Sequence, residues 1–149
     1  MKKFIALMLV LLVAFSLCAC SESKQAEPKA PEATIINKNG ETEYLTAADL
    51  LEINNGNSIA FSKTYKNAQV TLDAKVQKVN GACNYNGYPM NAYVELEGGW
   101  LVESTKGTDL SQLMPGDMVR ITGYIFDCYG QVHIRSMDNY PTTITPIGE

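Results

Sequence analysis

The sequence predicts a mostly β fold, a small Greek-key barrel of five strands preceded by one or two short helices. Three observations predict it. From residue 69 onward, apolar and polar residues alternate with the period of two that is typical of strands with one buried face. Turn pairs such as Gly98-Gly99 and Tyr129-Gly130 separate these runs. A helical spacing of apolar residues is confined to residues 46–66.

The N-terminus has the features of an export signal. Lys2 and Lys3 precede a mostly apolar stretch from residue 4 to residue 17. Leu17-Cys18-Ala19-Cys20 then resembles the bacterial lipobox, which implies cleavage before a diacylated cysteine. We therefore expect a lipoprotein signal peptide at residues 1–19 and a lipid on Cys20. An uncleaved membrane helix is the alternative, because Phe4 to Cys20 spans 17 residues, the lower limit of about 17–25.

Residues 20–42 are predicted to be the lipidated N-terminus and a flexible tether. Prolines, alanines and interspersed lysines and glutamates do not build a core. A coil of about 20 residues would hold the domain roughly 25 Å from the lipid. Ile35-Ile36 is too short to be predicted as a strand.

Two short helices follow the tether. Thr46 with Asp49 has the pattern of an N-cap with an acidic first turn, and Asn54-Asn55-Gly56 ends the first helix. Asn57 or Ser58 caps the second helix. The apolar residues expected to face the core are Leu50, Leu51, Ile53, Ile59, Phe61 and Tyr65.

The five strands are predicted from their alternation. The first runs from Gln69 to Asn80, and a polar loop leads from it to Asn91. The second, third, fourth and fifth carry, in order, Val94 and Leu96, Trp100 and Val102, Val119 to Ile125, and Val132 and Ile134. Asp109, Leu110 and Leu113 suggest one short helix between the third and fourth strands, and residues 141–149 are predicted to be a tail.

Five strands with a helix between the third and the fourth describe the OB-fold, a partly open Greek-key barrel. The sequence resembles the tRNA-anti-like OB-fold domains over about residues 55–137. Three motifs carry the resemblance: Asn57-x-x-Ala60, Tyr65-Lys66-Asn67-Ala68-x-Val70 and Leu110-x-x-Leu113-x-Pro115-Gly116-Asp117-x-Val119-x-Ile121-x-Gly123. That resemblance implies a place among secreted bacterial proteins and lipoproteins, and a relation by fold to anticodon-binding domains. It does not imply tRNA binding. The folded domain is expected at residues 43–140.

Charge argues against nucleic acid as a partner. Without Lys2 and Lys3, the mature chain has ten Lys and Arg against sixteen Asp and Glu, a formal charge of −6. A surface that follows phosphates needs clustered cations, and the sequence has no such run.

No catalytic residue, metal ligand or cofactor is predicted. His133 is the only histidine, and nothing in the sequence brings a nucleophile to it. Two cysteines that lie 45 residues apart lack zinc spacing. We therefore expect a protein that is not an enzyme.

Cys83 and Cys128 are expected to form a disulfide. Both fall in loops at the same end of the predicted barrel, and export would place them where disulfides persist. Two unpaired thiols are the alternative.

The outward face of the barrel is the candidate ligand site. Aromatic residues at alternate positions and three cationic or titratable residues are predicted to share it; they are Tyr93, Tyr124, Phe126, Arg120, His133 and Arg135. OB-folds bind oligonucleotides or oligosaccharides on such a face. The alternative is that the N-terminal helices pack over this row.

Two classes of function follow. The first is a non-enzymatic envelope module that binds a glycan, a peptide or a protein through the aromatic face. The second is a structural or assembly accessory of an envelope complex without a small ligand. Nucleic-acid binding is a distant third. The expected location is extracytoplasmic, on the cell membrane or on the outer membrane of a two-membrane host.

Overall fold

The structure is a computed structural model that describes residues 29–85 and 88–148. The predicted signal peptide and Cys20, the predicted site of acylation, lie outside these residues. None of the helices in the described ranges is both long enough and apolar enough to cross a bilayer.

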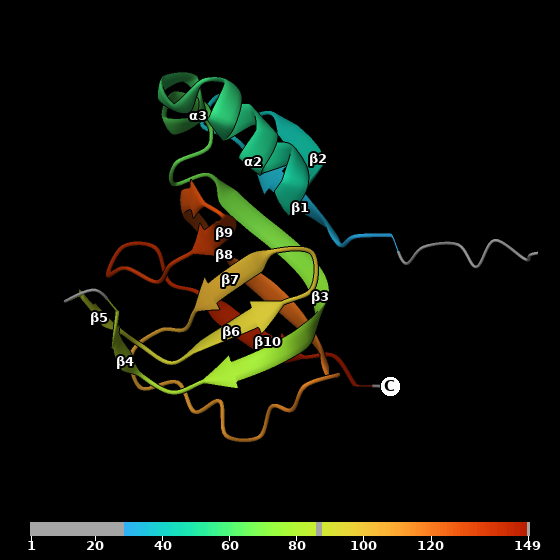
Figure 1. The fold of residues 1–149 in the computed structure, drawn as a ribbon, viewed down its shortest axis with the longest axis vertical. Helices are drawn as coiled ribbons and strands as arrows, with labels where there is room; N and C mark the ends of the chain where they lie inside the picture. The colour runs from blue at the N-terminus through green and yellow to red at the C-terminus, as the bar shows by residue number, and fades with distance from the viewer. Residues whose placement is uncertain (1–28, 86–87, 149) are drawn as a thin grey trace, which may run out of the picture.

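A closed five-stranded barrel forms the body of the protein (Figure 1). Its strands lie in the order β3 (Gln69–Asn80), β6 (Tyr93–Leu96), β7 (Trp100–Glu103), β9 (Gln131–Ile134) and β8 (Met118–Tyr129), and β8 pairs with β3 to close it. β7 and β9 run parallel, whereas the other neighbours are antiparallel. The predicted mostly β fold with five barrel strands is confirmed.

Strict alternation builds the core of this barrel. On β3, the residues Val70, Leu72, Ala74 and Val76 are all buried while their neighbours are more exposed. Trp100 is fully buried, as expected from its phase with Val102. Side chains on opposite faces of a strand alternate, so the sequence period decides which residues fill the barrel.

Two strands precede the helices, in a region where the sequence predicted a tether. β1 (Glu32–Ile36) pairs with β3 and with β2 (Thr42–Thr46). Ala33 and Ile35 of β1 are fully buried. The prediction that residues 20–42 form a tether is therefore wrong from Glu32 onward, and the expected domain start at residue 43 is eleven residues too late.

The predicted tail at residues 141–149 is also wrong in part. β10 (Thr143–Pro146) pairs with the first half of β8. A short hairpin, β4 (Cys83–Tyr85) with β5 (Tyr88–Met90), occupies the predicted loop after β3.

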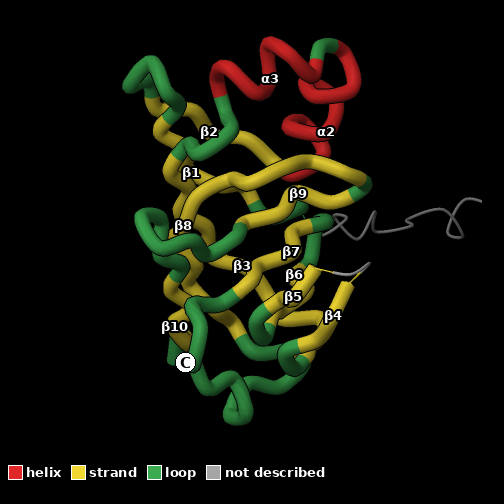
Figure 2. The backbone as a smooth tube through the Cα atoms, turned by 90° about the vertical axis from the view of Figure 1, so that its left-hand side faces the viewer, coloured by secondary structure: helices red, strands yellow, loops and turns green. Residues whose placement is uncertain are grey.

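Both predicted helices are present, as α2 (Ala47–Gly56) and α3 (Ser58–Thr64). Thr46 and Asp49 form a capping box, and the hydrogen bond from the Thr46 hydroxyl lowers the pKa of Asp49. Leu50 and Phe61 are buried, but Ile59 is 71% exposed, contrary to the expectation that it faces the core. The two helices lie at one end of the barrel (Figure 2).

The short helix predicted between the third and fourth barrel strands is absent. Residues 104–117 form successive turns instead. The Asp109 side chain accepts a hydrogen bond from the backbone N–H of Ser111, a local bond that competes with a helix. Leu110 and Leu113 are nevertheless buried, so the segment closes the opposite end of the barrel with its apolar residues while staying irregular.

Candidate functional site

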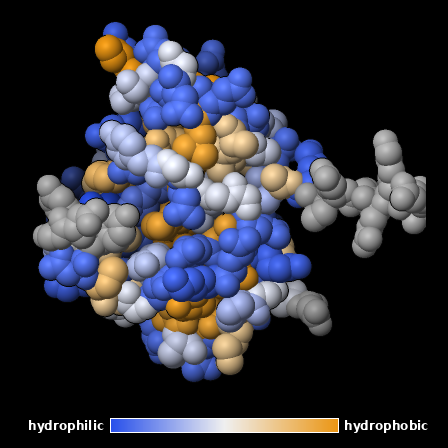
Figure 3. Space-filling view, viewed as in Figure 1, coloured by the Kyte–Doolittle hydropathy of each residue, from blue (hydrophilic) through white to orange (hydrophobic). Residues whose placement is uncertain are grey.

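A pocket of about 540 Å³ lies on the outer face of the barrel. It is lined by Met90, Tyr93, Glu95, Leu101, Phe126, Asp127, Tyr129, Gln131, His133 and Arg135. On the side of the molecule drawn in Figure 3, hydrophilic residues predominate and apolar residues form small separate patches. The pocket combines aromatic and charged side chains, which is the mixture that ligand sites use.

Alternation along three short strands aims these side chains outward. Val94 and Leu96 of β6 fill the core, which leaves Tyr93 and Glu95 on the outer face. Leu101 lies between buried residues of β7 in the same way. The residues that line the pocket therefore alternate along the strands with the residues that form the core.

The strand register sets a row of four side chains across this face. Glu95 of β6 pairs with Leu101 of β7, and Leu101 pairs with His133 of β9. His133 in turn pairs with Asp127 of β8. Directly paired residues share a face and lie close together, so two carboxylates flank an apolar residue and an imidazole.

A bulge in β8 widens the row. Ile125 pairs with Ile134 and Asp127 with His133, which leaves Phe126 as an extra residue between them. Phe126 and Asp127 are both half-buried, and Cys128 then returns to the core. Bulges commonly redirect a side chain in this manner.

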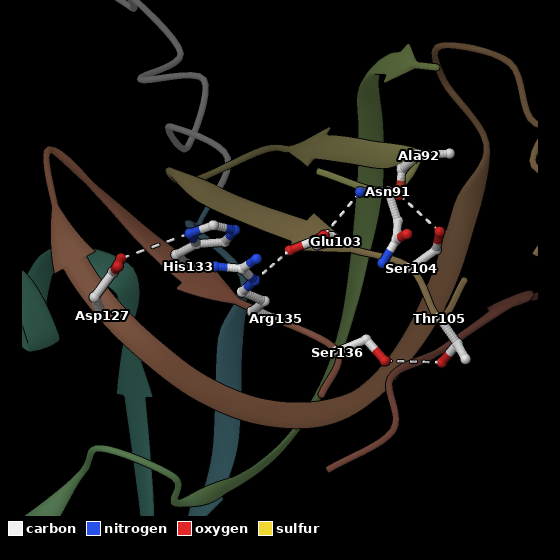
Figure 4. Close-up of polar contacts among 9 residues, drawn as sticks. All are labelled: Asn91, Ala92, Glu103, Ser104, Thr105, Asp127, His133, Arg135 and Ser136. Carbon is white, nitrogen blue, oxygen red and sulfur yellow. Dashed lines mark hydrogen bonds and ion pairs between the residues drawn. The ribbon is translucent and has the colours of Figure 1, made fainter. Parts of the chain in front are cut away.

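A buried ion pair lies beneath the pocket (Figure 4). Glu103 is 1% exposed, and its Oε2 lies 2.9 Å from Nε of Arg135, outside hydrogen-bond alignment. Its Oε1 accepts a hydrogen bond of 2.8 Å from the backbone N–H of Asn91. The positive charge of Arg135 is thus largely balanced within the protein.

Phe126 organises the side chains around it. The guanidinium of Arg135 lies 5.1 Å from its ring centroid, and Nζ of Lys66 lies 5.5 Å from the same centroid. The His133 ring meets it edge-on at 5.9 Å. Such cation–π and edge contacts fix the ring, so Phe126 positions its neighbours more than it offers a free stacking surface.

His133 has one paired and one unpaired nitrogen. Nδ1 lies 3.6 Å from Oδ1 of Asp127 (Figure 4). Nε2 is buried and has no hydrogen-bond partner among residues 29–85 and 88–148. A buried polar atom without a partner is costly. Because this nitrogen has almost no accessible surface, a ligand in the pocket could reach it only if neighbouring side chains moved.

The structure brings four of the six predicted face residues together. Tyr93, Phe126, His133 and Arg135 line the pocket. The other two, Arg120 and Tyr124, face away from the core as expected but do not line this pocket. Arg120 forms a bidentate ion pair with Asp73 of β3, at 2.7 and 2.6 Å, and Tyr124 packs edge-on against Tyr140 at 4.8 Å.

The predicted disulfide is not formed. Cys83 and Cys128 are both free cysteines, the first exposed and the second buried. Burial, with a smaller contribution from Asp127, raises the pKa of Cys128 to about 12. Its thiol therefore remains protonated and unreactive at neutral pH.

Several pocket residues were not predicted from the sequence. Glu95, Leu101 and Gln131 were missed although each occupies an outward strand position, so strand phase could have indicated them. Glu103 and Asp127 have no comparable signal, because a buried carboxylate and a bulge both depend on neighbouring strands.

Within the part of the chain that the structure describes, no three His, Cys, Asp or Glu side chains gather where a metal ion could bind. Comparisons with protein-family models, curated proteins and solved structures gave no match.

Proposed function

We propose that the barrel is an OB-fold and that the chain is a non-enzymatic, lipid-anchored binding module of the cell envelope. If the barrel strands are numbered in chain order, their order around the barrel is first, second, third, fifth and fourth, and the third and fifth strands are parallel. This arrangement supports the fold proposal, since the OB-fold is a five-stranded Greek-key barrel.

The observation that carries the functional proposal is the pocket on β6, β7, β8 and β9, over which neither of the described helices packs. Its volume of about 540 Å³ falls within the range of about 300–1,000 Å³ of ligand sites. Tyr93, Phe126 and His133 are only half-buried, and the helices lie at the end of the barrel (Figure 1). Burial of this row beneath residues 47–66 would have favoured the accessory role instead.

The pocket chemistry favours a glycan or a peptide as ligand. Glu95, Asp127 and Gln131 offer acceptors to hydroxyl or amine groups, and Tyr93 and Tyr129 offer aromatic surface. Arg135 is already paired with Glu103. Neutral or cationic groups are therefore suited to this site, whereas a polyanion is not.

Site-specific crosslinking tests this proposal. A photo-crosslinking amino acid at Leu101, in the acylated protein in intact cells, is expected to give one discrete adduct. The same probe at exposed Lys75, on the opposite side of the β3 pleat from the core, serves as the control. Adding Tyr93→Ala should weaken the Leu101 adduct, whereas Tyr44→Ala, at an exposed tyrosine outside the pocket, should not. Equal adducts at both probe positions would contradict the proposal.

The anchor is tested separately, through Cys20. Metabolic labelling with a fatty-acid probe is expected to mark the wild-type protein, and Cys20→Ala should abolish the label. Unchanged labelling of that variant would exclude Cys20 as the lipid attachment site.

A further inference from the structure

A second hollow of about 550 Å³ lies between α3 and the end of β8. It shares Phe126, Asp127 and Tyr129 of β8 with the pocket on the barrel face, and apart from Cys128 its remaining lining residues come from other elements. Three lysines, Lys38, Lys63 and Lys66, line it together with the hydroxyls of Ser58 and Ser62.

These lysines are an unbalanced positive cluster on an acidic protein. The chain has a formal charge of −4, yet no carboxylate lies within ion-pair distance of the three amines among the described residues. The lining also includes the carboxylate of Asp127, 3.6 Å from Nδ1 of His133, so three lysines stand against one acidic side chain. The charge of the cluster is therefore available to a ligand.

The cluster is positioned by the fold. Lys38 follows β1, where its backbone N–H donates to the carbonyl of Thr64 and its Nζ lies 3.5 Å from the carbonyl of Ser62. Lys66 lies over the Phe126 ring. Buried Phe61 and Cys128 lie beneath them, so three chain segments present their amines around one hollow.

We propose that this hollow binds a phosphate group. Ammonium groups and serine hydroxyls are donors, and lysine is a common phosphate ligand. Three cations match a doubly charged phosphate better than a single carboxylate. The phosphate can come from a lipid headgroup or from a soluble phosphate ester, and the exposed side chains of Ile59 and Tyr129 at the same hollow suit either source.

Lysine footprinting on the acylated full chain tests this assignment. An amine-acylating reagent is applied to protein in neutral detergent with and without inorganic phosphate. It is also applied to protein reconstituted in vesicles of phosphatidylcholine, alone or mixed with phosphatidylglycerol. The expected result is selective protection of Lys38, Lys63 and Lys66, with Lys75 and Lys106 as internal controls. Protection by inorganic phosphate supports a soluble source, and protection only by phosphatidylglycerol supports a lipid source.

A charge-matched pair of variants gives the second measurement. Lys63→Gln/Lys66→Gln should raise the concentration of phosphate or phosphatidylglycerol needed for protection about 30-fold, since each lysine contributes about a factor of five to binding near an anionic group. Lys75→Gln/Lys106→Gln removes the same charge from exposed sites outside the hollow and should have little effect. Absence of protection by both probes, or equal protection of all lysines, would overturn the proposal.

Discussion

At the scale of single residues, the ion pair between Glu103 and Arg135 connects the buried interior of the barrel with its outer face. The carboxylate of Glu103 is almost fully buried, and the Arg135 guanidinium that balances it also lies against Phe126. Removing one partner of such a pair leaves an uncompensated buried charge, which is more costly than replacing both. The pair therefore links the stability of the barrel to the form of its pocket.

We expect Arg135→Leu to lower the free energy of unfolding by about 2–3 kcal/mol, because Glu103 is then buried without a countercharge. Urea denaturation measures this change. The double variant Glu103→Gln/Arg135→Leu should regain part of the loss, since glutamine keeps an acceptor for the Asn91 N–H. A single variant as stable as the wild type would contradict this account of the pair.

The two free cysteines should differ sharply in reactivity. Cys83 is exposed, whereas burial raises the pKa of Cys128 to about 12 from the model-compound value of 9.0. Iodoacetamide at pH about 8 should therefore alkylate Cys83 in the native protein, and both cysteines only after unfolding. Mass spectrometry of the labelled peptides reads this out.

The same shift predicts the direction of a pH effect. Above pH 9.0 the unfolded chain begins to lose the Cys128 proton that the native state retains up to about 12, so stability should fall as pH rises through this window. A Cys128→Ala variant should show a weaker fall. Rapid alkylation of Cys128 in the native protein would contradict the raised pKa on which both predictions about this residue rest.

At the scale of elements, β8 is the strand that joins the two halves of the sheet. Its first part pairs with β3 and β10, and its last part pairs with β9. Gly123 lies near the end of the first part, where it pairs with Val70, and a Cβ there would approach Cγ2 of Ile134 to 2.7 Å and Oγ1 of Thr142 to 3.1 Å. The strand can pass this point only because the side chain is absent.

Gly123→Ala is therefore expected to destabilise the barrel by about 1–3 kcal/mol, the usual cost of overpacking. Thermal or urea unfolding measures the loss. Gly81→Ala is the matched control, since nothing lies within 4 Å of a Cβ at that glycine. Equal stability of the two variants would show that the close approach at Gly123 is relieved without cost.

The elements that the sequence predicts well are those with several alternating buried residues. β3 has four such residues in succession, and the capping box at Thr46 marks the start of α2. β1 has only two buried apolar residues and β10 has none that is fully buried. Their pairing depends on β3 and β8, which lie far away in the sequence, so local patterns could not predict them.

The same limit applies to the candidate site. Strand phase placed Tyr93 and His133 correctly on the outer face. It also placed Arg120 on the outer side of β8, but β8 is twelve residues long and its first half pairs with β3, so Arg120 lies away from the pocket. The bulge that brings Asp127 into the pocket is set by the pairing with β9, which no single-strand period contains.

At the scale of the whole molecule, the two hollows differ in charge. The barrel-face pocket includes Glu95 and Asp127 with one paired arginine, whereas the hollow beside α3 shares Asp127 but has three lysines that form no ion pair among the described residues. Among residues 29–85 and 88–148, these charges do not form a single positive groove along the barrel of the kind that nucleic-acid binding requires.

The protein should consequently fail to retain single-stranded DNA or RNA at physiological salt. Fluorescence anisotropy with a labelled oligonucleotide, at low and at physiological salt, measures this. A local cluster of three lysines can give weak, salt-sensitive association at low ionic strength. Micromolar or tighter binding at physiological salt, with a steep salt dependence, would restore nucleic acid as the ligand.

In a protein acylated at Cys20, as proposed above, the start of β1 at Glu32 would limit how far the domain extends from the membrane. Eleven residues separate Cys20 from this first strand, and a fully extended chain of that length reaches at most about 40 Å. The domain of an acylated protein would thus be confined to a thin layer above the lipid headgroups. Within that layer, a partner held in the same membrane is met at a high effective concentration, so modest intrinsic affinity is enough for stable engagement.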